Sequence, residues 1–315
     1  MTRTFSSHCC EGTTPRMSSE AIVRSKSQSL VLVTIAYLIA VGVGVAAGWL
    51  IWGPGTGRMW LDTLIADVLA TVVIFVFSRL YRNSSFYDAY WSVIPPLLLV
   101  YWWSQSGVHE LRCWLIAMVI ALWAVRLTAN WVYSFPGLHH EDWRYPMLRA
   151  SAGRWSFLAD LVAIHLIPTL LVFLGMVPAY VAVTRPVGDL VWLTTIACLV
   201  GLAAVALELV ADVQMHRFTG NRRPGEVMDR GLWSWSRHPN YFGEFSFWLS
   251  LALFGIAVSP ADAWWLCLGA AGMLGMFLGS SIPMMEQRSL QRRPEYRDVI
   301  ARVSRFVPRP PRKSA

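Results

Sequence analysis

Long runs of hydrophobic residues, separated by short polar segments, recur along the chain from residue 30 onward. Such runs are typical of membrane-spanning helices, because a helix needs about 20 apolar residues to cross a bilayer. They predict an all-α fold, a polytopic transmembrane helical bundle with about eight spans, with seven and nine as the alternatives. We place the spans at residues 30–52, 61–79, 89–104, 111–133, 158–184, 189–211, 245–259 and 262–283.

The polar segments divide the chain into three parts. Residues 1–29 are rich in Ser and Thr and lack the apolar segment of a signal peptide, so we expect a disordered N-terminal tail. Residues 30–283 form the transmembrane helical domain, which includes a long polar loop at 212–244. Residues 284–315 form a basic C-terminal tail.

Charge is distributed unevenly between the two sides of this bundle. With eight spans, 23 of the 27 Lys and Arg residues fall on the side of the two termini, and only Arg58, Arg112 and Arg185 fall on the other. Cytoplasmic loops carry an excess of Lys and Arg, so both termini are predicted to be cytoplasmic. The net charge of +8 then reflects this excess in the cytoplasmic loops, and we expect membrane lipids, not nucleic acid, as partners.

Composition excludes several other classes of protein. Hydrophobic residues make up 55% of the chain and charged residues only 15%, whereas about 25% is usual in soluble domains. The five cysteines include an adjacent pair and form no disulfide framework. No spacing of His and Cys suggests a metal site. We expect an integral, multi-pass membrane protein, in a bacterial inner membrane, and the oligomeric state is left open.

Three ionisable residues near the end of one span lie at regular intervals. Glu208, Asp212 and His216 are four residues apart, so they share one face of a helix that runs into the polar loop. A charge at membrane depth costs about 2.5–3.5 kcal/mol to insert. The alignment predicts a polar site at the mouth of the bundle, with interhelical ion pairs as the alternative.

Other polar residues at membrane depth have simpler interpretations. Arg126 could belong to the polar site, or it could pair with Asp67 or Asp160. Asp67 and Asp160 by themselves are expected to be structural. His165 lies in an apolar run and is interpreted as a core histidine whose ring is hydrogen-bonded.

The polar loop has the composition of an anion-binding site. Arginine matches phosphate geometry, and the neighbouring aromatic rings offer faces to a nucleobase. Asn240 and Glu244 share a face if a helix begins at Pro239. These groups could hold a nucleotide at the membrane surface, although contact with anionic lipid would also explain the arginines. No Gly-rich nucleotide motif accompanies them.

Several segments together resemble the steroid 5-alpha-reductase-like membrane family, in particular its DUF1295 branch. The segments are SRHPNYFGE at 236–244, GLW at 231–233, ELVADVQMHRF at 208–218, FYDAYWS at 86–92, WAVRL at 123–127, EDWRYPMLR at 141–149 and PEYRDVIARVSRFVP at 294–308. The resemblance extends over roughly residues 60–310. It implies NADPH-dependent reduction of a carbon–carbon double bond conjugated to a carbonyl, in an apolar lipid or steroid-like substrate.

Reduction of an enone builds negative charge on the carbonyl oxygen, which needs a hydrogen-bond donor. We expect Asp88, kept protonated by apolar surroundings, or Arg126 in this role; Asp88 could instead pair with Arg79 or Arg82. The resemblance itself implies which residues bind the cofactor. The residues implied in cofactor binding are Asp212, Arg222, Arg223, Arg237, His238, Asn240, Tyr241, Glu244, Tyr296 and Arg297.

Two alternative functions remain open. The Arg-His-Pro segment and the tail also resemble isoprenylcysteine-type carboxyl methyltransferases, which use S-adenosylmethionine. Their tail commonly carries paired glutamates, whereas this chain has Met285 followed by Glu286. The second alternative is a lipid-binding membrane protein without catalytic activity.

Overall fold

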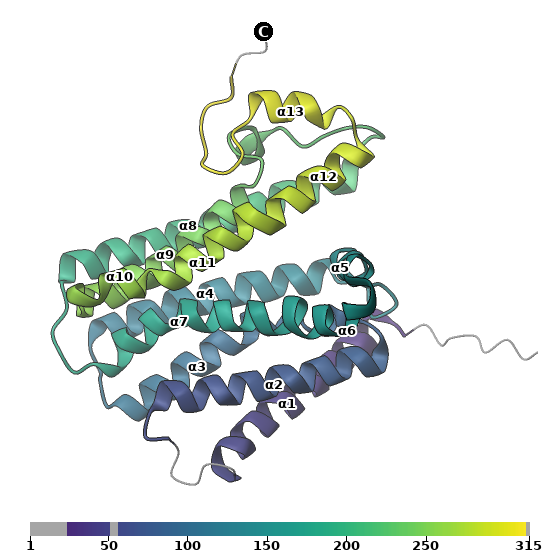
Figure 1. Ribbon diagram of the computed structural model, residues 1–315. Coiled ribbons are helices and arrows are strands. Elements are labelled where there is room, and N and C mark those ends of the chain that lie inside the picture. The colour runs from purple at the N-terminus through teal and green to yellow at the C-terminus, as the bar shows by residue number, and fades with distance from the viewer. Residues whose placement is uncertain (1–23, 51–55, 313–315) are drawn as a thin grey trace, which may run out of the picture.

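The computed structural model describes residues 24–50 and 56–312, with side chains described for 24–47 and 56–312. This part of the chain is helical throughout and contains no strand (Figure 1). The longer helices are α1 (Lys26–Leu50), α2 (Met59–Tyr81), α3 (Tyr90–Ser106), α4 (Leu111–Ser134), α7 (Ile167–Thr184), α8 (Val191–Asn221) and α9 (Pro239–Val258). The shorter ones are α5 (Arg144–Ala152), α6 (Ser156–Ala159), α10 (Ala263–Leu266), α11 (Leu268–Met276), α12 (Ile282–Arg292) and α13 (Tyr296–Arg302).

The helices confirm the predicted polytopic bundle. Seven helical runs in the described residues are long and apolar enough to cross a membrane, with α5–α7 and α10–α12 each counted as one run. The eighth predicted span is α3, a helix of 17 residues that contains Pro95 and Pro96. At 1.5 Å per residue it reaches only about 25 Å, somewhat less than the hydrocarbon core. The short run predicted at 245–259 is extended because α9 begins at Pro239.

Both ends of the transmembrane domain differ from the expected boundaries. Helix α1 begins at Lys26, before the predicted boundary at residue 30, and residues 1–23 of the expected tail lie outside the described residues. The basic C-terminal segment is folded: α12 continues to Arg292, and α13 packs through Tyr296 and Val299 on a small apolar cluster of its own.

Helices α4 and α7 occupy the middle of the bundle. Figure 1 shows α1–α3 on one side of them and α8, α9 and the α10–α12 run on the other, with α13 beyond the end of α12. Gly243 of α9 faces α8, and a Cβ at this position would collide with the side chain of Glu208. This glycine therefore allows α8 and α9 to pack closely where their acidic residues lie.

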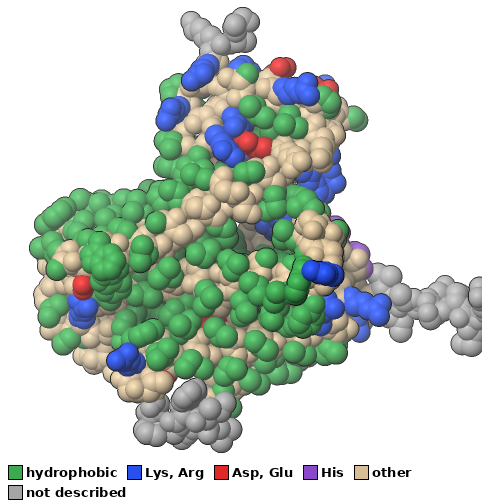
Figure 2. Space-filling model, in the orientation of Figure 1, with side chains coloured by type: hydrophobic (Ala, Val, Ile, Leu, Met, Phe, Trp, Pro, Cys, Tyr) green, Lys and Arg blue, Asp and Glu red, His purple; other side chains and the backbone are tan. Residues whose placement is uncertain are grey.

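The surface of the bundle is apolar and its ends are charged. Figure 2 shows hydrophobic side chains over the body of the molecule and a gathering of Lys and Arg on the part that contains α13. Large side chains such as Leu38, Val125 and Trp264 are 69–75% exposed on this surface. Exposure of this kind fits helices that face lipid. Which end faces the cytoplasm stays a prediction.

Candidate functional site

Arg126 is enclosed by three carboxylates near one end of the bundle. Its Nη2 lies 2.6 Å from Glu208 Oε2 and 3.3 Å from Glu244 Oε2, and its Nη1 lies 3.1 Å from Asp212 Oδ2. The side chains of all four residues are at most 11% exposed. The structure thus places Arg126 with the polar residues of α8 and joins them by interhelical ion pairs, which was the alternative prediction; the role of this cluster as a site stays a prediction. The alternative partners of Arg126, Asp67 and Asp160, are wrong.

Glu244 is held from both sides by tryptophans. Trp123 Nε1 donates to its two carboxylate oxygens at 3.2 and 3.1 Å, and Trp248 Nε1 donates to Oε1 at 3.0 Å. Trp123 is three residues before Arg126, so both face the same way from α4. The indoles fix the carboxylate in one orientation and screen it from lipid.

Several buried side-chain polar atoms have no hydrogen-bond partner among the described residues, and those of Arg126 and Glu208 belong to this cluster. They are Asn240 Oδ1, Arg126 Nε, Trp131 Nε1 and both carboxylate oxygens of Glu208. Glu208 is close to Arg126, but the contact lacks the alignment of a hydrogen bond. A buried polar atom without a partner is costly, so several together point to groups that a ligand would satisfy.

The cluster continues along α8 toward the end of the helix. His216 Nε2 lies 2.7 Å from Asn130 Oδ1, one turn beyond Arg126 on α4. Asp212 lies between His216 and Glu208, as the intervals of four predict. The face predicted from sequence therefore packs against α4.

Arg237 and His238 hold the C-terminal segment in place. Arg237 Nε donates to Glu286 at 2.6 Å, while Nη1 donates to the carbonyls of Ile300 and Val303 at 3.1 and 2.6 Å. His238 Nε2 lies 3.3 Å from Glu286 Oε1. Burial lowers the pKa of His238, so the ring is neutral near pH 7 and its Nε2–H donates to Glu286. Both side chains therefore already have partners within the protein.

The remaining residues implied in cofactor binding divide into buried and exposed ones. Tyr241 is half-buried, with its ring 4.9 Å from that of Phe277, and Tyr296 is buried in the small apolar cluster. Arg222, Arg223 and Arg297 are exposed. The structure does not bring these three arginines into the Arg126 cluster, and their role in cofactor binding stays a prediction.

Asp88 faces a tyrosine. It lies in the connection between α2 and α3, and its Oδ1 accepts a hydrogen bond from the hydroxyl of Tyr145 at the start of α5. Desolvation raises the pKa of Asp88 to about 6, while the bond from Tyr145 and the nearby Arg144 act in the opposite direction. Arg79, an alternative partner predicted for Asp88, instead pairs with Asp160.

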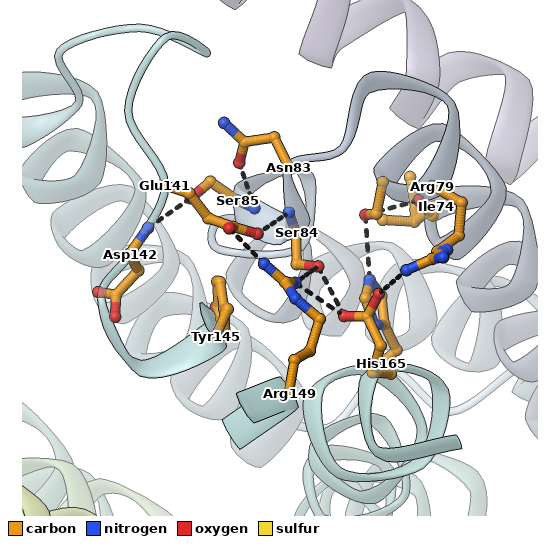
Figure 3. A network of polar contacts seen from close by, with 12 residues as sticks. Ile74, Arg79, Asn83, Ser84, Ser85, Glu141, Asp142, Tyr145, Arg149 and His165 are labelled. Atoms are coloured by element: carbon orange, nitrogen blue, oxygen red, sulfur yellow. Dashed lines mark hydrogen bonds and ion pairs between the residues drawn. The ribbon is translucent and has the colours of Figure 1, made fainter. Parts of the chain in front are cut away.

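A polar network ties together the loops that carry Asp88 and Tyr145, and Figure 3 shows Ser84, Glu141 and Arg149 pointing toward one another within it. Asp160 accepts bonds from Ser84 Oγ at 2.7 Å and from Arg79 and Arg149 at 3.2 and 3.3 Å. Glu141 accepts from the Ser84 backbone at 2.7 Å and also pairs with Arg149. The connection 82–89 is therefore tied to the start of the α5–α7 run.

His165 belongs to the same region and is confirmed as a hydrogen-bonded core histidine. Its Nε2 lies 3.1 Å from Ser78 Oγ, and its Nδ1 lies 2.7 Å from the carbonyl of Asp160. Asp67 is likewise structural, since its Oδ1 accepts from the hydroxyl of Tyr90 at 2.9 Å. The backbone forms a π-helical turn over Asp160–Leu166, which brings the ring under the Asp160 carbonyl.

Two tryptophans, Trp91 and Trp123, connect Asp88 with the Arg126 cluster. Trp91 Nε1 donates to the carbonyl of Asp88 at 2.7 Å, and the Trp91 ring packs edge-on against Trp123 at 6.3 Å. Trp123 in turn donates to Glu244. Asp88 and Glu244 thus lie at opposite ends of one edge-to-face pair of indoles, which places both at the same end of the bundle.

Sequence reasoning did not identify several of these contacts. Trp123 and Trp248 could have been found by spacing, because they lie three residues before Arg126 and four residues after Glu244. Tyr145 and Glu286 are 57 and 48 residues from their partners Asp88 and His238. No local signal predicts those two pairs.

Comparison with known proteins identifies the family. A family described as a protein of unknown function (DUF1295) matches residues 74–303. An uncharacterised protein of the fission yeast Schizosaccharomyces pombe is 29% identical over 285 residues, which cover 81% of this chain and 80% of the relative. That relative is fungal, so it does not support a bacterial membrane, and no solved structure matches the chain significantly. The chain belongs to the DUF1295 family, within the steroid 5-alpha-reductase-like branch that its Arg-His-Pro-Asn-Tyr segment indicates.

Proposed function

We propose that the protein is a membrane-embedded reductase that uses NADPH to reduce a carbon–carbon double bond conjugated to a carbonyl in an apolar lipid. One observation carries the proposal: the buried, unpartnered Asn240 Oδ1 lies on the α9 face that also presents Glu244 to Arg126. Hydrogen-bond acceptors without partners suit a ligand that brings N–H donors.

The residues of the cluster fit the carboxamide end of a nicotinamide. A carboxamide offers two N–H donors, and Asn240 Oδ1 and the oxygens of Glu208 are acceptors that lack aligned donors. Asn240 and Glu208 would bind this end, and the Trp123 and Trp248 indoles would keep water away from it. When bound, NADPH supplies the hydride.

The carbonyl of the substrate requires a hydrogen-bond donor, because hydride addition to the β-carbon places negative charge on the carbonyl oxygen. Arg126 is already surrounded by three carboxylates, so it suits the role of counter-ion. Asp88, with a pKa of about 6 and a hydroxyl neighbour in Tyr145, holds a proton at mildly acidic pH and can donate it. We therefore assign the donor role to the Asp88–Tyr145 pair.

The apolar surface of the bundle favours a lipid substrate that enters from the membrane, while the exposed Arg222 and Arg223 favour a phosphorylated cofactor that enters from water. The tests need no known substrate. Detergent-purified protein is titrated with NADPH and, separately, with S-adenosylmethionine, and thermal unfolding is followed. Ligand at one hundred times its dissociation constant should stabilise the protein by about 2.7 kcal/mol.

A pair of amide variants tests the site. Asn240→Ala should abolish stabilisation by NADPH, whereas Gln105→Ala, which removes an exposed amide at the other end of the bundle, should leave it unchanged. Normal NADPH affinity in Asn240→Ala would refute the site. Stabilisation by S-adenosylmethionine alone would make the protein a methyltransferase, and no response to either ligand would favour a lipid-binding protein without catalytic activity.

A further inference from the structure

The C-terminal segment forms a polar pocket that lies outside the bundle and is separate from the Arg126 cluster. A surface pocket of about 280 Å³, open to solvent, is lined by residues within 300–312, and four of the lining residues are arginines. They are Arg302, Arg305, Arg309 and Arg312. None of the four is among the residues that the family resemblance implies in cofactor binding.

The backbone around this pocket is firmly held. The N–H of Arg309 donates to the carbonyl of Trp235 at 2.9 Å, and the N–H of Arg312 donates to the carbonyl of Arg302 at 3.0 Å. The second bond closes the segment on itself and brings its last arginine beside its first. Figure 1 shows this segment next to the connection between α8 and α9.

Prolines limit the freedom of the same segment. Pro308, Pro310 and Pro311 flank Arg309 and precede Arg312, and each fixes its own φ angle. Less conformational entropy is therefore lost when these two arginines bind a ligand. The backbone that carries these arginines is thus preorganised by its hydrogen bonds and by the neighbouring prolines.

Positive charge exceeds negative charge at this pocket. Arg302 pairs with Asp229 at 3.1 Å, and Arg305 lies 3.6 Å from Glu286, which already neutralises Arg237. Within the described residues, no carboxylate forms an ion pair with Arg309 or Arg312. Mutual repulsion of these guanidinium groups is relieved by a multivalent anion, and arginine binds phosphate oxygens through two N–H groups at once.

We propose that the four arginines bind a phosphate monoester, which approaches from the aqueous side. The group could be the 2′-phosphate of a dinucleotide or the phosphate of a lipid headgroup. The dinucleotide source rests on the proposed function, and it is supported by the bonds from Arg237, next to His238 and Asn240, to the carbonyls of Ile300 and Val303 in the pocket wall. The lipid source is independent of that function.

The experiment compares four probes on detergent-purified, full-length protein: NADPH, NADH, dioctanoyl phosphatidic acid and dioctanoyl phosphatidylcholine. Only NADPH and phosphatidic acid carry a phosphate monoester. The test variant is Arg309→Gln/Arg312→Gln, and the control is Arg154→Gln, which removes an exposed arginine far along the chain from the pocket. Affinity is measured by calorimetry and thermal shift.

A tenfold or greater loss of NADPH affinity in the double variant, with NADH affinity unchanged, would identify the 2′-phosphate as the ligand. A comparable loss for phosphatidic acid alone would identify a lipid phosphate. Arg154→Gln should behave as wild type, and Arg309→Lys/Arg312→Lys, which keeps both charges but loses the paired N–H groups, should lose less affinity than the glutamine variant. Unchanged affinity for both monoesters in a folded double variant would overturn the proposal.

The two proposals can fail separately. Wild-type protein that binds neither NADPH nor NADH would refute the proposed reductase. Binding of phosphatidic acid to wild type and to the double variant would still show whether the pocket binds a phosphate monoester. Protein that binds NADPH and NADH equally, and phosphatidic acid no better than phosphatidylcholine, would refute the pocket and leave dinucleotide binding standing.

Discussion

At the scale of single residues, the Arg126 cluster contains more negative than positive groups. One guanidinium faces the carboxylates of Glu208, Asp212 and Glu244. Removing the only cation of a buried cluster leaves uncompensated charges, so Arg126→Gln should destabilise the protein by about 3–5 kcal/mol. Glu208→Gln removes one carboxylate and should be neutral or stabilising. Thermal unfolding of both variants in one detergent measures the difference, and equal destabilisation would contradict the charge argument.

The raised pKa of Asp88 predicts that the stability of the folded protein depends on pH. Its pKa is about 6 in the folded protein, above the ordinary value of 3.8, so the folded state holds the proton more tightly than the unfolded state. The stabilising contribution is complete below about pH 4 and is lost as the pH rises through 6. The difference in unfolding free energy is about 3 kcal/mol, because each unit of pKa shift corresponds to about 1.4 kcal/mol.

Asp88→Asn has no titrating group at this position, so its melting temperature should fall less than that of wild type between pH 4 and pH 7. Asp62→Asn, at the other end of α2, is the matched control and should follow the wild-type curve. Parallel curves for wild type and Asp88→Asn would show that desolvation does not raise this pKa.

At the scale of elements, hydropathy predicts the helices well because lipid selects for apolar length. The eight runs, the beginning of α9 at Pro239 and the shared face of Glu208, Asp212 and His216 all follow from local sequence. The π-helical turn at Asp160–Leu166 does not, because its apolar residues read as ordinary helix. That turn brings the His165 ring to the Asp160 carbonyl, a bond formed only in the folded chain.

Partners across elements were the least predictable part of the site. Arg126 was expected either in the polar site or beside Asp67 or Asp160, and periodicity along one helix could not decide between these options. The position of Arg126 depends on Gly243, because this glycine lets α8 approach α9 closely. Glu208 and Glu244 can then both contact the Arg126 guanidinium. The partner of Asp88 was equally out of reach of local sequence, because Tyr145 is 57 residues away.

At the scale of the whole molecule, the two ends of the bundle differ in free charge. At the end away from the termini, Arg112 is buried and lies 3.5 Å from Asp189, and Arg185 pairs with Asp262 at 2.8 Å. The opposite end carries exposed arginines such as Arg82, Arg154 and Arg292. Segments rich in Lys and Arg stay in the cytoplasm, so this asymmetry predicts the orientation of the protein.

Single cysteines test that orientation in a variant whose five native cysteines are replaced. Arg154→Cys and Arg292→Cys report on the basic end, and Arg58→Cys and Val187→Cys report on the other; all four positions are exposed. In sealed membranes whose cytoplasmic face is inside, a membrane-impermeant maleimide should label positions 58 and 187 at once, and positions 154 and 292 only after permeabilisation. The reverse pattern would place the termini outside. In the eight-span bundle, four spans separate positions 58 and 187, and four separate positions 154 and 292. The two positions of each pair must therefore lie on the same side of the membrane, and different labelling within a pair would contradict the eight-span bundle.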